Sequence, residues 1–85
     1  MLPKDLLEPL GLDALLVTRP ENVRYLSGFP HPEDAQVLVT GEGAFVLTDP
    51  RYPEAERESR IPAKVLRREE REALLKTLKG RVGFE

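Results

Sequence analysis

The side chains that could do chemistry in this 85-residue chain are few and scattered. There is one histidine, His31, and no cysteine, which excludes disulfides, cysteine-ligated zinc and thiol catalysis. A hydrolytic two-metal site needs about five converging carboxylate or imidazole ligands, whereas the aspartates fall in separate predicted turns. A serine nucleophile needs a histidine base, and Ser27 is better placed to bond the end of a helix. The sequence therefore predicts no catalytic residue and no metal ligand in this chain.

Two further patterns also have simpler explanations than chemistry. Gly41 and Gly43 resemble half of a phosphate loop, but they lie between two predicted strands, whereas a phosphate cradle needs a strand followed by a helix. The basic stretch 64–71 is interrupted by Glu69 and Glu70, so little counterion release is available to drive nucleic-acid binding. We expect a hairpin turn, a solvated helix surface and no nucleic-acid partner.

Composition is that of an ordinary globular domain. Apolar residues make up 40%, charged residues 33%, and the net charge is −2, whereas disordered chains combine low hydrophobicity with high net charge. No apolar run approaches the roughly 18 residues of a membrane span, and the first residues lack the features of a secretory signal. We expect one domain over residues 1–85, located in the cytoplasm, with no membrane partner.

The elements that must position the candidate residues follow from periodicity, prolines and glycines. Helices are predicted at 4–10, 20–27, 53–59 and 68–79, and strands at 14–17, 36–40, 44–48, 64–66 and 81–85. Gly28 suits a left-handed helix cap, and the prolines of segment 29–34 predict a loop without regular structure. The order predicts an α/β domain with a mixed sheet flanked by helices, a hairpin and a later parallel crossover. Because domains seldom end where a strand begins, we expect the last strand either to continue in a longer parent protein or to pack on a partner.

Two segments stand out from this background. Asn22–Phe29 is compatible with a capped amphipathic helix whose Tyr25 packs at the edge of the core. Leu47–Tyr52 is compatible with a strand end at which Asp49 accepts backbone N–H groups in an Asx-type turn. Taken separately, neither segment requires a function.

Together and in this order, Leu12–Val17, Asn22–Phe29 and Leu47–Ala55 resemble the N-terminal domain of the creatinase/prolidase/aminopeptidase P family. That family's pattern is N-[IV]-x-Y-L-[ST]-G-F followed by D-x-R-Y-x-x-x-A, and 81–85 is similar to its next strand. The resemblance implies a ribonuclease-H-like fold that contains no catalytic metal ligand. It assigns a structural role to six residues, Asn22, Tyr25, Gly28, Asp49, Arg51 and Tyr52, with Arg51 pairing with Asp49 or with a helix end.

The resemblance also implies a role for the parent protein. Such proteins are proline-specific (Xaa-Pro) aminopeptidases or prolidases, metal-dependent hydrolases whose two Mn, Co or Zn ions lie in a following pita-bread catalytic domain, absent from these 85 residues. The N-terminal domain helps to form a homodimer and narrows access for proline-containing peptides. Its loop after the first motif approaches the neighbouring active site, which here means Phe29, His31 and Glu33. We therefore expect the isolated chain to be inactive.

Three alternatives compete with this interpretation. A stand-alone binding or dimerisation module would use the same sheet without a peptidase partner domain. A ribonuclease-H-like nuclease would need clustered acids at strand ends, which the sequence lacks. Creatine hydrolysis is disfavoured because no arginine lies between Gly28 and Val37.

Overall fold

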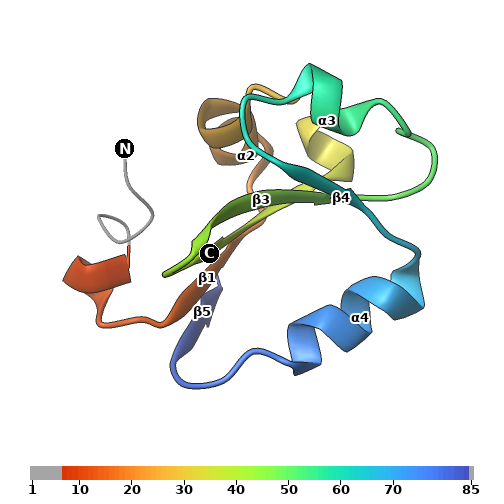
Figure 1. Ribbon diagram of the computed structural model, residues 1–85. Coiled ribbons are helices and arrows are strands. Elements are labelled where there is room, and N and C mark those ends of the chain that lie inside the picture. The colour runs from red at the N-terminus through yellow and green to blue at the C-terminus, as the bar shows by residue number, and fades with distance from the viewer. Residues whose placement is uncertain (1–6, 85) are drawn as a thin grey trace.

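The sheet is built on the apolar runs at 14–17, 36–40 and 44–48, with a short strand added at each edge (Figure 1). The structure is a computed structural model, and it describes residues 7–84. The strands are β1 (Ala14–Val17), β2 (Gln36–Thr40), β3 (Gly43–Thr48), β4 (Ala63–Val65) and β5 (Val82–Phe84). The helices are α2 (Pro20–Ser27), α3 (Ala55–Glu58) and α4 (Arg68–Lys76), and the 3₁₀ turns are η1 (Glu8–Leu10) and η2 (Pro32–Asp34).

The sheet is mixed, as the sequence predicts, with the strand order β4-β3-β2-β1-β5. β2 pairs antiparallel with both β1 and β3, placing Leu38 opposite Leu16 on one side and Phe45 on the other. β4 and β5 pair parallel with β3 and β1 respectively. β2 is therefore antiparallel to all the other strands, and the carboxyl ends of the others lie at the same end of the sheet.

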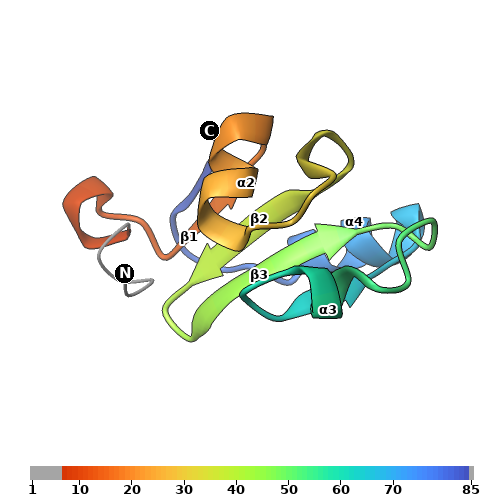
Figure 2. The ribbon, with the colours of Figure 1, turned by 90° about the horizontal axis from the view of Figure 1, so that it is seen from above.

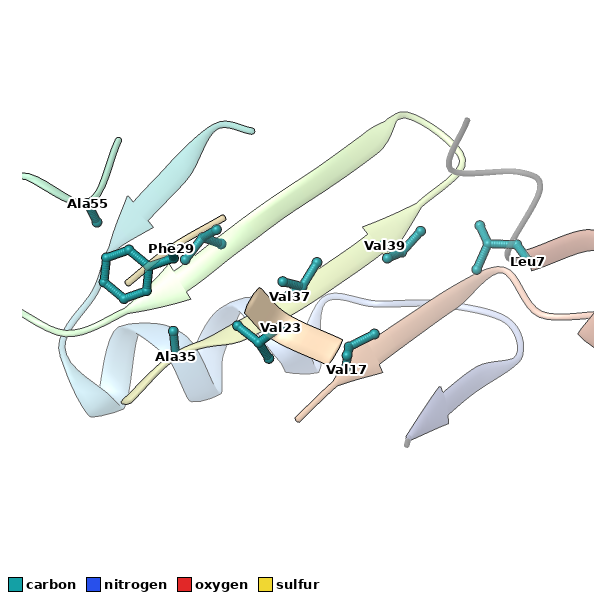
Figure 3. Packing of buried hydrophobic residues seen from close by; sticks show 9 residues of the cluster. Leu7, Val17, Val23, Phe29, Ala35, Val37, Val39 and Ala55 are labelled. Atoms are coloured by element: carbon teal, nitrogen blue, oxygen red, sulfur yellow. The ribbon is translucent and has the colours of Figure 1, made fainter. Parts of the chain in front are cut away.

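Successive side chains of a strand point to opposite faces, so the apolar strands place hydrophobic residues on both faces of the sheet. Both faces are covered. One face buries Val17, Val37, Val39 and Val46 against the α2 side, where Val23 and Phe29 are completely inaccessible to solvent. Figure 3 shows Val23 of α2 lying over Val17 and Val37. The other face buries a second group, Ala14, Leu16, Leu38 and Leu47, beneath the leucines of the α4 region. Figures 1 and 2 show α2 and α4 on opposite sides of the sheet.

Several elements are shorter than predicted, for local reasons. α4 ends at Lys76 rather than at residue 79. At this end the Thr77 N–H donates to the Leu74 carbonyl three residues earlier, at 3.0 Å, and tightens the last turn. α3 begins only at Ala55, because the preceding residues form turns closed by bonds from Tyr52 to Asp49 and from Ala55 to Tyr52. Residues 4–6 of the first predicted helix, and Glu85 of the last predicted strand, lie outside the described residues.

One prediction needs correction. The loop at 29–34 is not wholly irregular, since Pro32–Asp34 forms a 3₁₀ turn closed by the Ala35 N–H donating to the Pro32 carbonyl. The later crossover joins parallel strands as predicted, and α4 carries the chain across the whole sheet, so that β4 and β5 lie at opposite edges. Among the described residues, no helix has both the length and the apolar character needed to cross a membrane.

The burial pattern predicts which leucines hold the fold together. Leu47 is completely buried, whereas Leu10 is 61% exposed. Leu47→Ala leaves a cavity between β3 and α4 and should lower the free energy of unfolding by about 2–5 kcal/mol. Leu10→Ala, the matched control, should change it by no more than about 0.5 kcal/mol. Urea denaturation followed by circular dichroism measures both, and similar losses for the two variants would contradict the assignment of the core.

Candidate functional site

The loop between α2 and β2 and the turn after β3 lie side by side. Both are at the end of the sheet that holds the carboxyl ends of β1, β3, β4 and β5. The loop begins at Gly28, whose backbone is left-handed with φ of 71°. Ser27 accepts the Phe29 N–H at 3.1 Å and donates its hydroxyl to the Val23 carbonyl at 2.5 Å. That is the bond to the helix end expected for this serine, and it directs Phe29 into the core. The loop is thereby fixed where it leaves α2.

A chain of charged and hydrogen-bonded groups fixes the far end of the loop. The Tyr52 hydroxyl donates to Oδ2 of Asp34, and the Arg51 guanidinium lies 3.3 Å from Oδ1 of the same carboxylate. Arg51 also pairs with Asp49 through two bonds, Nε to Oδ1 at 2.9 Å and Nη2 to Oδ2 at 2.7 Å. The Thr48 hydroxyl donates to the Asp34 carbonyl at 2.9 Å. Asp34 is thus bonded from three successive parts of the β3 strand end and turn.

Aromatic rings fill the space between these two ends. The His31 imidazole stacks on the Tyr52 ring with 4.8 Å between centroids. Phe29 meets both rings edge-on, at 5.6 Å from His31 and 5.7 Å from Tyr52, a geometry that aromatic quadrupoles favour. His31 is therefore packed on a buried phenylalanine and a hydrogen-bonded tyrosine rather than free at the tip of a loop.

The charges around the turn after β3 shift the pKa values of Asp49, Arg51 and Tyr52 in the direction that preserves their bonds. The side-chain bonds from Arg51 lower the pKa of the Asp49 carboxyl, against a smaller opposing effect of desolvation. The same bonds, reinforced by the charge of Asp34, raise the pKa of Arg51 further above its usual range. Donation to the Asp34 carboxylate raises the pKa of the Tyr52 phenol. The ion pair and the neutral phenol therefore persist at neutral pH.

The structure gathers some of the residues that the sequence singled out and separates others. Phe29, His31, Asp49, Arg51 and Tyr52 form one cluster together with Asp34. Within it, the Arg51 N–H donates to Oδ1 of Asp49 at 2.9 Å in the expected Asx-type turn. The other four lie outside it: Asn22 and Tyr25 on α2, Gly28 at the end of α2, and Glu33 exposed in η2. Tyr25 does not pack at the edge of the core, because its side chain points to solvent and is 71% exposed.

Sequence reasoning missed Asp34, which joins the loop to the turn. Its only local signal is a position just before the β2 run, and the partner Tyr52 lies 18 residues further along the chain. Within residues 7–84, no three side chains of His, Asp or Glu gather where they could hold a metal ion. The carboxylates of Asp34 and Asp49 are already occupied by Arg51 and Tyr52, so the cluster does not fit a metal. Its geometry indicates a structural role, in which the bonds of Asp34 hold the loop to the turn after β3.

The model of the Creatinase/Prolidase N-terminal domain family matches residues 4–85 of the sequence. The chain belongs to this family. A search of the curated proteins found no match.

Solved structures of this domain type agree with the family assignment. The prolidase from Pyrococcus horikoshii OT3 is 28% identical with a TM-score of 0.79, and the match covers 98% of this chain but 24% of that one. The N-terminal creatinase/prolidase-like domain of a Corynebacterium diphtheriae protein classed as a metallopeptidase is 32% identical with a TM-score of 0.76, covering 98% of this chain and 72% of that one. This creatinase/prolidase-type domain thus spans about a quarter of the prolidase's length.

A third structure shares the fold. The N-terminal domain of the cytoplasmic peptidase PepQ from Mycobacterium tuberculosis H37Rv is 24% identical with a TM-score of 0.66, covering 98% of this chain and 87% of that one. The fold of this chain is therefore the α/β fold of the N-terminal domains of prolidase- and aminopeptidase-P-like proteins.

The bond from Tyr52 to Asp34 predicts a measurable titration. In a Tyr25→Phe background Tyr52 is the single tyrosine, and tyrosinate absorbance should give it a pKa above the ordinary 10.0. The folded state holds this proton more tightly than the unfolded state does. The bond therefore stabilises the fold below the ordinary tyrosine pKa, and this stability is lost as the pH rises through the pKa of Tyr52 in the folded chain. Adding Asp34→Asn should lower the pKa of Tyr52 towards 10.0. Adding Glu33→Gln removes a neighbouring exposed charge and should leave it nearly unchanged; equal shifts would contradict a specific bond.

Proposed function

We propose that this domain is a non-catalytic part of a proline-specific (Xaa-Pro) metallopeptidase, either an aminopeptidase P or a prolidase, and that it acts in dimer assembly and substrate gating. Membership of the creatinase/prolidase N-terminal family supports the class of parent protein. One observation carries the gating role: the loop that presents His31 is held at both ends. Asp34 is bonded to Tyr52 at one end, and Phe29 packs against Tyr52 at the other.

A gating loop must hold its shape before the substrate arrives. Pro30 and Pro32 flank His31 and restrict the backbone of the unfolded chain, which lowers the entropy lost when the loop is ordered. The outer surface of the loop stays available for contact, because Pro30 and Glu33 are exposed while Phe29 is buried. A peptide approaching this edge would therefore meet a preformed surface made of Pro30, His31 and Glu33.

We place the bond-breaking chemistry in a pita-bread catalytic domain of the parent protein, where two divalent metals (Mn, Co or Zn) would activate water. The acids gathered in the cluster of this domain are engaged in holding its shape, which supports a role in assembly and access rather than hydrolysis. The proposed partners are that catalytic domain and a second copy of the protein in a homodimer. Tyr25 and Phe84, 71% and 69% exposed, offer the kind of aromatic surface that interfaces bury.

We also propose that the parent protein works in the cytoplasm. Support comes from PepQ of Mycobacterium tuberculosis, which shares this fold and is described as a cytoplasmic peptidase.

The first experiment tests the assignment of no intrinsic activity. The purified 85-residue chain is incubated with Mn²⁺ or Co²⁺ and an Xaa-Pro dipeptide, and release of free proline is measured. We expect no turnover above buffer with the same metal. Turnover that survives repeated purification, and that a substitution within the chain abolishes, would overturn the proposal.

The second experiment tests gating in the parent peptidase. His31→Ala removes a surface that meets the substrate but does not take part in bond cleavage, so KM for Xaa-Pro peptides should rise about 2- to 10-fold with kcat nearly unchanged. Glu42→Ala, exposed in the hairpin turn at the opposite end of the sheet, is the matched control and should leave both constants unchanged. An unchanged KM in His31→Ala, or an equal effect of the two variants, would contradict the gating role.

A further inference from the structure

The carboxyl end of α2 is finished by groups that come from far along the chain. The last carbonyls of an α-helix have no partner within the helix and must find one elsewhere. Here Gly28 N–H donates to the Arg24 carbonyl at 2.7 Å. Two more bonds come from Arg60: its backbone N–H donates to the Ser27 carbonyl and its Nη2 to the Tyr25 carbonyl, each at 2.7 Å. A guanidinium at this end is also favoured by the negative pole of the helix dipole.

The stem of Arg60 lies directly over Gly28. A Cβ atom at position 28 would sit 3.0 Å from Arg60 Nε and 3.5 Å from Arg60 Cγ. Gly28 therefore answers two requirements at once, its left-handed backbone with φ of +71° and the close approach of this arginine. The connection from α3 to β4, which carries Arg60, passes the end of α2 (Figure 1).

Arg60 belongs to the same stretch of chain that holds the other end of the loop. The segment 49–60 begins with the Asp49–Arg51–Tyr52 turn, which binds Asp34 at the end of the loop. It continues through α3, whose Ala55 is buried in the same core cluster as Phe29 (Figure 3). It ends at Arg60, at the point where the loop leaves α2. One segment thus holds the loop 28–34 at both of its ends.

We propose that Arg60 is a positioning residue for the loop 28–34. By occupying the terminal carbonyls of α2 and covering Gly28, it fixes the direction in which the chain leaves the helix, and with it the position of His31 against Tyr52. This assignment concerns the geometry of the loop and holds whether or not the loop meets a substrate. Its consequence for catalysis rests on the proposed gating role.

The test compares three variants of the 85-residue chain by NMR. Arg60→Ala should speed hydrogen exchange of the Gly28 and Phe29 amides about tenfold, the effect of losing one charge-assisted bond. It should also move the His31 ring protons out of the ring-current field of Tyr52. Arg60→Lys keeps a cation and should restore part of both signals. Arg57→Ala is the control, because Arg57 lies in the same segment but its side chain pairs with Glu54.

Exchange at the β2 amides of Val37 and Val39 separates positioning from general stability. We expect it to stay within about twofold of the wild type in Arg60→Ala under conditions where exchange proceeds by local opening. Unchanged loop signals, or equal acceleration of loop and β2 amides, would overturn the proposal.

A second arm tests the contact between Arg60 and Gly28. Gly28→Ala should lower the urea midpoint in the wild-type chain more than in Arg60→Ala, because the clash with the arginine is absent in the second background. Equal reductions would overturn the proposed packing. In the parent peptidase, a displaced loop with an unchanged KM would reject the gating role and leave the positioning role of Arg60 supported.

Discussion

The burial of Phe29 is the constraint on which the arrangement of the loop 28–34 and the turn after β3 depends. Its ring is completely excluded from solvent, and burying a phenylalanine is worth roughly 1.5–3 kcal/mol. Because Phe29 directly follows the glycine that ends α2, its burial sets where the loop starts. His31 and Tyr52 then meet this ring edge-on. The loop therefore takes its shape from the hydrophobic core beneath it.

The polar groups above that core are arranged to satisfy each other. Arg51 lies between the carboxylates of Asp34 and Asp49, and Tyr52 supplies a neutral donor to Asp34. Exposed ion pairs contribute little individually, but the two bonds between Arg51 and Asp49 have the planar, paired geometry that gives such contacts directional value. The balance of opposite charges favours a fixed conformation, since the carboxylates of Asp34 and Asp49 are both bonded to neighbouring side chains.

Local signals in the sequence were sufficient for most of the fold. The strands at 14–17 and 36–40 were predicted with the bounds they have, because their apolar runs are continuous and end at polar or turn residues. The helix at 20–27 was equally clear from Pro20 at its start and Gly28 at its end. The family motifs indicated the creatinase/prolidase N-terminal family, which periodicity alone leaves open.

What could not be predicted depends on contacts between distant residues. Nothing near Asp34 reveals that Tyr52 will bond to it, and nothing near Arg60 reveals that it will reach a helix that ended 33 residues earlier at Ser27. The position of β5 at the far edge of the sheet likewise depends on the path of α4 rather than on its own three residues. Such features become visible only when the sheet has brought the segments together.

The outermost strands of the sheet have a consequence for how the domain behaves among other proteins. β4 and β5 are each three residues long, and β4 carries a lysine at its centre. Exposed strand edges can recruit extended segments of other chains, and short or charged edges limit this. The β4 border, which is short and carries this lysine, therefore offers few consecutive backbone groups for pairing with another chain.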